Sequence, residues 1–82
     1  MTGSEDKFRL GFAQNLARLM EAQGSSVAAV AEASGLKPSR IERLIAAKAE
    51  PGAIEIMRLA KALHVTPGDL IDDIVRGSDS EA

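Results

Sequence analysis

The side chains best suited to chemistry are basic and hydroxyl groups gathered within residues 37–48. The polar residues of this segment are Lys37, Ser39, Arg40, Glu42, Arg43 and Lys48. Lysine and arginine neutralise phosphates, and arginine or serine can also donate hydrogen bonds to base edges in the DNA major groove. The segment is therefore a candidate nucleic-acid surface. The alternative interpretation is that it is only the solvent-exposed face of a surface helix.

The apolar pattern of the same segment predicts a helix that turns these polar groups outward together. Ile41, Leu44 and Ile45 recur at spacings of three and four residues, as on the buried face of a helix. Two starts are open: Pro38 suits a first helical position, whereas Ser39 with Glu42 forms a capping box. Three alanines are expected to prolong the helix before Pro51 and Gly52 end it. They are Ala46, Ala47 and Ala49.

A second short helix is predicted immediately before this one. Ser25 or Ser26 can cap it, Gly35 supplies the left-handed residue that ends it, and Leu36 is expected to enter the core. Its small apolar stripe consists of Ala28, Val30, Ala31 and Ala33. Two short helices joined by a tight turn form a helix-turn-helix, the element that would position the basic segment.

Three further helices are expected around this pair. The first runs from about Glu5 to Gln23, capped by Ser4 and ended by Gly24, and the fourth stops near His64. The fifth opens with Thr66 as cap, Pro67 at the first position and Asp69 at the third. The apolar positions of the three helices are Phe8, Phe12, Leu16, Leu19 and Met20; Ile56, Leu59, Ala60 and Leu63; and Leu70, Ile71, Ile74 and Val75.

The composition sets limits on domain number and chemistry. With 82 residues, 45% of them hydrophobic, the chain is expected to form one all-α domain over residues 1–76 with a polar tail over 77–82. Cysteine is absent and His64 is the only histidine, so we expect no enzyme, no metal site and no cofactor. We also expect no membrane span and no small-molecule effector, which suits a cytoplasmic, nucleoid-associated protein.

Charge is distributed unevenly along the chain. The net charge of −2 argues against a polyanion partner, yet the central part from Lys7 to Val65 holds nine basic and five acidic residues. Both ends are acidic. Phe8 and Phe12 are the only aromatic residues and are expected in the core, so stacking on single-stranded nucleic acid is excluded. Asp69, Asp72 and Asp73 are better explained by the helix dipole than by a cation.

Over residues 16–71 the chain resembles the phage repressor and Cro (XRE) family. The most specific part is Pro51 to Leu70, which contains IMRLAKALHVTPGDL, and Ala31, Gly35 and Ile41 also fit the family pattern. The resemblance implies a five-helix lambda-repressor-like domain that binds duplex DNA, with the helix-turn-helix at helices two and three. Genes of this kind include phage repressors, restriction controllers and antitoxins, and the sequence does not separate these contexts.

Several positions depart from the family pattern. Val27 stands where the family often places a phosphate-binding glutamine, and Ala46 and Ala47 replace an Asn-Gly pair that usually ends the recognition helix. The family's ion pair between helices one and three falls on Met20 and Ile45, which are both apolar here. Because packed apolar groups can replace an ion pair without loss, we predict that these two side chains touch in the core.

The resemblance and the exposed face together define the expected DNA-binding residues. Ser39 and Arg43 are the expected base readers, and Lys37, Arg40 and Lys48 the expected phosphate contacts. The remaining expected contacts are Ser26, Val27, Pro38 and Glu42. The chain is thus predicted to be a small stand-alone repressor-like regulator that reads the major groove with helix three. The alternative is a protein-interaction module or antitoxin that keeps the fold with weak or no DNA binding.

A homodimer is expected, because one short recognition helix contacts too few base pairs for useful specificity. The fifth helix offers more apolar surface than a small core absorbs, which makes Leu70, Ile71, Ile74 and Val75 the favoured dimerisation residues. Pairing of the first helices through Phe8 and Leu10 is the alternative.

Overall fold

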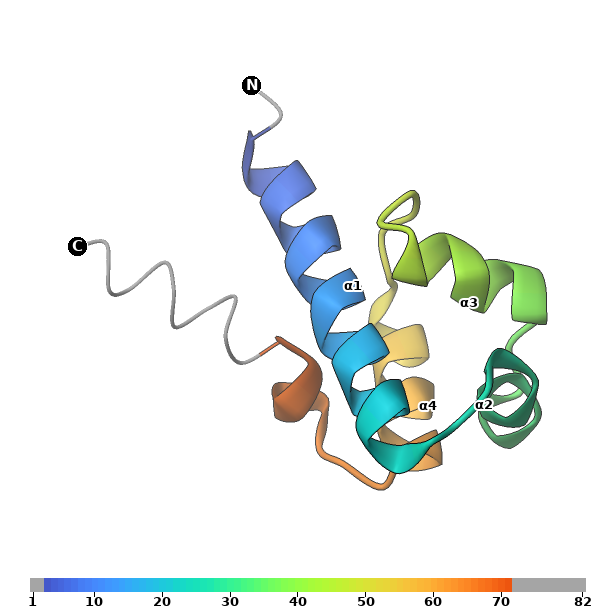
Figure 1. Cartoon of the computed structure of the whole chain (residues 1–82). Helices are drawn as coiled ribbons and strands as arrows, with labels where there is room; N and C mark the ends of the chain where they lie inside the picture. Colours follow the sequence, from blue (N-terminus) through green and yellow to red (C-terminus); the bar gives the residue numbers. More distant parts are fainter. Residues whose placement is uncertain (1–2, 72–82) are drawn as a thin grey trace.

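The computed structural model describes residues 3–71, with side chains from residue 7 onward, and every regular element in this part is helical. The helices are α1 (Gly3–Gln23), α2 (Val27–Ser34), α3 (Pro38–Ile45) and α4 (Ala53–Ala62), followed by a fifth helical segment that begins at residue 67 (Figure 1). The all-α, five-helix prediction is confirmed. Because α1 already includes Ser4, the prediction that Ser4 caps this helix is wrong.

The core is a single apolar cluster to which every helix contributes. Its members are Phe12, Leu16, Met20, Val30, Ala31, Ile41, Leu44, Ala49, Leu59, Ala60, Leu63 and Leu70. α2 packs against both α3 and α4, and α1 packs against α3. Figure 1 shows α2 and α3 together at one side of α1. The helix-turn-helix is therefore held in place by helix packing, through α3 against α1 and through α2 against α4.

The left-handed residues explain where three of the helices end. Gly24, Ala47 and His64 have φ of 66°, 62° and 59°. In each case the amide of the residue directly after the left-handed one reaches back to the final turn of the helix; for α3 it is the Lys48 N–H, which donates to the Arg43 carbonyl at 2.9 Å. The predicted ends at Gly24 and near His64 are confirmed. The prediction that Ala46, Ala47 and Ala49 prolong α3 is wrong, because the left-handed turn at Ala47 breaks the helix after Ile45.

The two ends of α2 follow the predicted chemistry. The Ser26 hydroxyl accepts a hydrogen bond from the Ala29 amide at 3.1 Å, so Ser26 rather than Ser25 is the cap. Gly35 has φ of 80°, and a Cβ there would lie 3.0 Å from Nη1 of Arg58. Both the backbone angle and the close approach therefore favour glycine at this position.

The predicted apolar stripe of α2 is wrong in two of its four positions. Val30 and Ala31 are buried, but Ala28 and Ala33 are exposed and Ser34 is buried instead. Ser34 tolerates burial because its hydroxyl accepts from the Leu36 amide at 3.2 Å and donates to the Ala31 carbonyl at 3.4 Å. A polar residue thus occupies a core position that the alanine-rich pattern had assigned to Ala33.

The fifth helical segment is fixed by a cap and by a buried amide. Thr66 and Asp69 exchange side-chain-to-amide hydrogen bonds of 3.0 and 3.2 Å, which confirms the predicted threonine cap. The Asn15 amide, only 3% exposed, donates to the Leu70 carbonyl at 2.6 Å and accepts from Arg18 at 2.9 Å. Asn15 therefore ties α1 to the fifth segment, a role that the apolar periodicity of α1 did not indicate.

Candidate nucleic-acid interface

α3 presents a polar face above a fully buried apolar one. Ile41 and Leu44 are 0% exposed, whereas Ser39, Glu42 and Arg43 are exposed on the opposite side. This division follows from the helical spacing of the apolar positions, as the sequence predicted. The exposed face is the part of the helix-turn-helix that is free to contact another molecule.

The first turn of α3 decides between the two starts that the sequence left open. Pro38 is the first helical residue and Lys37 precedes it in extended backbone, without a side-chain cap. Glu42 is consequently not engaged in a capping box with Ser39. Lys37, Pro38 and Ser39 are all exposed at this end of the helix.

The far end of α3 brings two predicted DNA-binding residues together. Lys48 is exposed in the turn that follows the helix, and Arg43 Nη2 donates to the Lys48 carbonyl at 3.4 Å. This long hydrogen bond holds Arg43 only weakly, so its guanidinium stays available for other acceptors. The left-handed turn at Ala47 is what returns Lys48 to the vicinity of α3.

Arg40 does not point outward with the other polar residues of α3. Its Nε and Nη2 donate to the two Glu55 carboxylate oxygens at 2.8 and 2.9 Å, and Nη2 also donates to the Glu50 carbonyl at 3.0 Å. Hydrogen bonding to Glu55 raises the pKa of Arg40 above its ordinary range. The predicted outward orientation of Arg40 is wrong, because α4 supplies a bidentate partner that the sequence pattern did not reveal.

Glu55 links this ion pair to the start of α4. Its Oε1 accepts a hydrogen bond from the Gly52 amide at 2.9 Å, one of the amides that a helix start leaves unsatisfied. The Arg40 hydrogen bond holds the pKa of Glu55 below its usual range; partial burial opposes this, and the Gly52 amide adds to the lowering. One carboxylate therefore caps α4 and bridges it to α3.

The remaining expected contacts lie at the first turn of α2. The exposed Ser26 side chain is already the helix cap, and Val27 is half-buried against the core cluster. Their place at a helix N-terminus suits a phosphate, because the free amides there point outward. Val27 itself contributes packing rather than a polar contact.

The expected dimerisation residues divide into three groups. Leu70 is 0% exposed and belongs to the core, so its assignment to a dimer contact is wrong. Ile71 is half-buried and packs against the same core. Ile74, Val75 and the expected domain boundary at residues 76 and 77 lie outside the described residues.

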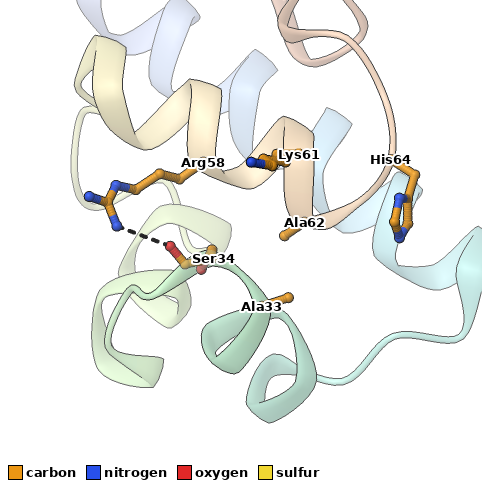
Figure 2. Close-up of a pocket in the computed structure, with 6 residues that line it drawn as sticks. All are labelled: Ala33, Ser34, Arg58, Lys61, Ala62 and His64. Atoms are coloured by element: carbon orange, nitrogen blue, oxygen red, sulfur yellow. Dashed lines mark hydrogen bonds between the residues drawn. The ribbon is translucent and has the colours of Figure 1, made fainter.

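A second basic region lies away from α3, in an open groove between α2 and α4 (Figure 2). It is lined by Ala33, Ser34, Arg58, Lys61, Ala62 and His64. Arg58 Nη1 donates to the Ser34 carbonyl at 3.4 Å, and Figure 2 shows the guanidinium directed at the C-terminal end of α2 while His64 lies at the other end of the groove. Arg58 and Lys61 do not point at a common centre, so these basic side chains border the α2–α4 groove and do not form a convergent anion site.

Comparison with known proteins fits this geometry. The family model of the Cro/C1-type helix-turn-helix DNA-binding domain matches residues 15–75. The chain belongs to this family. It is similar to the crystal structure of the restriction-modification controller protein C.AhdI from Aeromonas hydrophila, with 31% identity and a TM-score of 0.74 over 76% of this chain and 94% of that one. No curated protein sequence gave a significant match.

Family membership makes the protein a helix-turn-helix DNA-binding regulator, a class distinct from the enzymes. Within residues 3–71 no helix is long and apolar enough to cross a membrane. Among the same residues, no cluster of histidine and carboxylate side chains is arranged to hold a metal ion.

Proposed function

We propose that the protein regulates transcription by reading duplex DNA with α3 in the major groove, as a small repressor-like protein. The observation that carries this proposal is the exposed Ser39, Glu42 and Arg43 face above the buried Ile41 and Leu44, in a chain of this family. Ser39 and Arg43 read base edges, because hydroxyl and guanidinium groups can donate there.

Phosphate contacts come from both ends of α3 and from the start of α2. Lys37 precedes α3, Lys48 follows it, and both side chains are exposed. Ser26 stands at the N-terminus of α2, where free amides favour an anion. Arg40 has a different role in this proposal: its ion pair with Glu55 positions α3 instead of binding a phosphate.

The proposal also covers the biological context of the protein and the oligomeric state in which it binds DNA. Similarity to a restriction-modification controller protein favours a role in the control of a restriction-modification system over a role as a phage repressor or an antitoxin. The protein works as a homodimer, since two recognition helices one turn of DNA apart multiply the specificity of a single short helix. The rival function, a protein-interaction module that keeps the fold, draws support from the apolar Val27 at the α2 start.

Selection of bound duplexes from a random pool, followed by affinity measurements over a range of salt concentrations, tests the proposal. Arg43→Ala should cost about 1–3 kcal/mol on the selected site and relax discrimination at one base position. Lys48→Ala should weaken all duplexes alike and reduce the salt slope by about one. Lys7→Ala, which removes an exposed charge on α1, is the matched control. Binding that is insensitive to salt and survives both α3 changes would contradict DNA reading by α3.

A further inference from the structure

The exposed face of α3 carries one carboxylate, Glu42, that no other part of the described chain engages. Its side chain is exposed and forms no hydrogen bond or ion pair with another described residue. Glu55 differs, because Arg40 donates to both of its carboxylate oxygens and the Gly52 amide donates to one of them. Glu42 is therefore a free acceptor on the surface that meets DNA in the proposed function.

The helical spacing explains why Glu42 has no partner within the chain. The residues three or four positions away are the neighbours on a helix surface, and none of them is basic. They are Pro38, Ser39, Ile45 and Ala46. Arg43 is adjacent in sequence but lies about 100° further round the helix, and its Nη2 donates to the Lys48 carbonyl instead. The carboxylate is thus left to water or to another molecule.

Glu42 and Arg43 lie on either side of the middle of the α3 outer face. Ser39, a small residue, lies opposite the buried Ile41 and Leu44 and marks this middle. At about 100° per residue, Glu42 and Arg43 lie about 60° and 40° from Ser39, in opposite directions round the helix. A helix that lies in the major groove with Ser39 toward the bases therefore brings an acceptor and a donor to neighbouring base edges.

The major groove offers a carboxylate few partners. The phosphates repel it, as do the O6 and N7 acceptors of guanine and the O4 acceptor of thymine, so its partners are the amino groups of cytosine and adenine. The adenine amino group lies between two acceptors, its own N7 and the thymine O4. Cytosine N4 has an acceptor on one side only, the O6 of the paired guanine. Cytosine is therefore the base that suits a carboxylate best.

We infer that Glu42 is a specificity-determining residue, which accepts a hydrogen bond from N4 of a cytosine in the major groove and disfavours duplexes that lack this donor. The inference rests on the proposed function and deepens it, because it names a base that the bound site must contain. The same carboxylate weakens binding to the phosphates of every duplex, so part of the discrimination comes from rejection of wrong sites.

Selection of duplexes from a random pool by the parent protein and by Glu42→Gln tests the inference. Glutamine carries a donor beside its acceptor and pairs with N6 and N7 of adenine, so the variant should exchange a cytosine for an adenine at one position of the selected half-site. Glu21→Gln, which removes an exposed carboxylate on α1, is the matched control for the change in net charge and should select the parent's site. Circular dichroism checks that each variant is folded.

Affinity measurements give a second readout. Glu42→Ala should bind unrelated duplexes more tightly than the parent, and its ratio of affinities for the selected site and an unrelated duplex should be about tenfold lower. Methylation of N4 on the contacted cytosine places a methyl group where the carboxylate accepts. This modification should weaken the parent about tenfold and Glu42→Ala less than about twofold.

The outcomes separate this inference from the proposed function. Identical base preferences of the parent and Glu42→Gln, or equal sensitivity of the parent and Glu42→Ala to the methyl group, would overturn the role of Glu42. If Arg43→Ala still relaxed discrimination in that case, DNA reading by α3 would stand without it. Failure of the parent to select any duplex would overturn both.

Discussion

The two sides of α3 are held by different kinds of contact. Toward α1, the helix packs through Ile41, Leu44 and the half-buried Ile45 into the cluster that contains Met20. Toward α4, it is held by long polar side chains, with Arg40 donating to both Glu55 oxygens at 2.8 and 2.9 Å. The first contact is buried, with Ile41 and Leu44 both 0% exposed. The second lies nearer the surface, with the Arg40 and Glu55 side chains 34% and 22% exposed.

The two kinds of contact are expected to affect different properties of α3: its stability on the domain and its orientation. Apolar packing contributes in proportion to the area removed from water and has little directional preference. A bidentate ion pair is directional, but at a partly exposed site its contribution to stability is small. We therefore expect the α1 side to set whether α3 is folded onto the domain, and the α4 side to set the angle at which α3 faces DNA. The resemblance places a family ion pair at Met20 and Ile45, so in this chain the charged contact lies on the other side of the helix.

The largest expected effect comes from placing a charge on the apolar side. Ile45→Glu should lower the free energy of unfolding by about 3 kcal/mol, because a carboxylate beside the core cluster has no partner. Adding Met20→Arg should recover part of this loss if the two side chains touch, and urea unfolding of the single and double variants measures it. Ala46→Glu, at the adjacent exposed position, is the control and should change stability by less than about 0.5 kcal/mol. Equal stability of Ile45→Glu and the double variant would exclude the Met20 contact.

The turn that ends α3 offers a change that touches neither contact. Ala47 has φ of 62°, a conformation that costs a side-chain-bearing residue free energy and costs glycine almost none. Ala47→Gly should therefore raise the free energy of unfolding by about 1 kcal/mol and leave DNA affinity unchanged. Ala46→Gly is the matched control, because Ala46 has an ordinary φ of −82° and glycine gains nothing there. Equal thermal midpoints for the two variants would show that the turn is not strained.

The smallest effect on stability is expected on the polar side. Glu55→Gln should lower the free energy of unfolding by roughly 0.5–1 kcal/mol, since it removes a partly exposed ion pair but leaves an amide oxygen for the Gly52 amide. DNA affinity should fall by more than this small loss of stability explains, if the ion pair orients α3. Arg58→Gln, which alters another arginine contact of α4, is the control for affinity.

The same variant has a pH signature of definite sign. The pKa of Glu55 is lowered in the folded protein, chiefly by the Arg40 hydrogen bond, so the unfolded chain binds this proton more readily. The ion pair therefore contributes its full stability above the unfolded pKa, and this contribution is lost as the pH falls below about 4.5 through the folded pKa. Thermal unfolding at several pH values should show a steeper acid loss for the parent protein than for Glu55→Gln. If the thermal midpoints of the two proteins fell in parallel with pH, groups other than Glu55 would be responsible for the loss of stability in acid.

Much of the fold was determined by the sequence because the signals are local. Apolar residues at spacings of three and four place Ile41, Leu44 and Leu59 in the core, whichever partner covers them. Caps act over three or four residues, so Gly35 and Thr66 could be assigned from their neighbours alone, whereas the cap of α2 was narrowed only to Ser25 or Ser26. The family resemblance then added the order of the helices and the exposed face of α3.

Other features depended on contacts between segments far apart in the chain, which only the tertiary structure supplies. Whether Arg40 faces solvent or Glu55 depends on where the start of α4 lies, fifteen residues later. Burial of Asn15 is possible because the Leu70 carbonyl, fifty-five residues away, accepts its hydrogen bond. The same packing removed Leu70 from the surface and left Ile54 and Met57 on it. The helical period identifies which residues share a face, but only the packing of neighbouring helices decides which faces are covered.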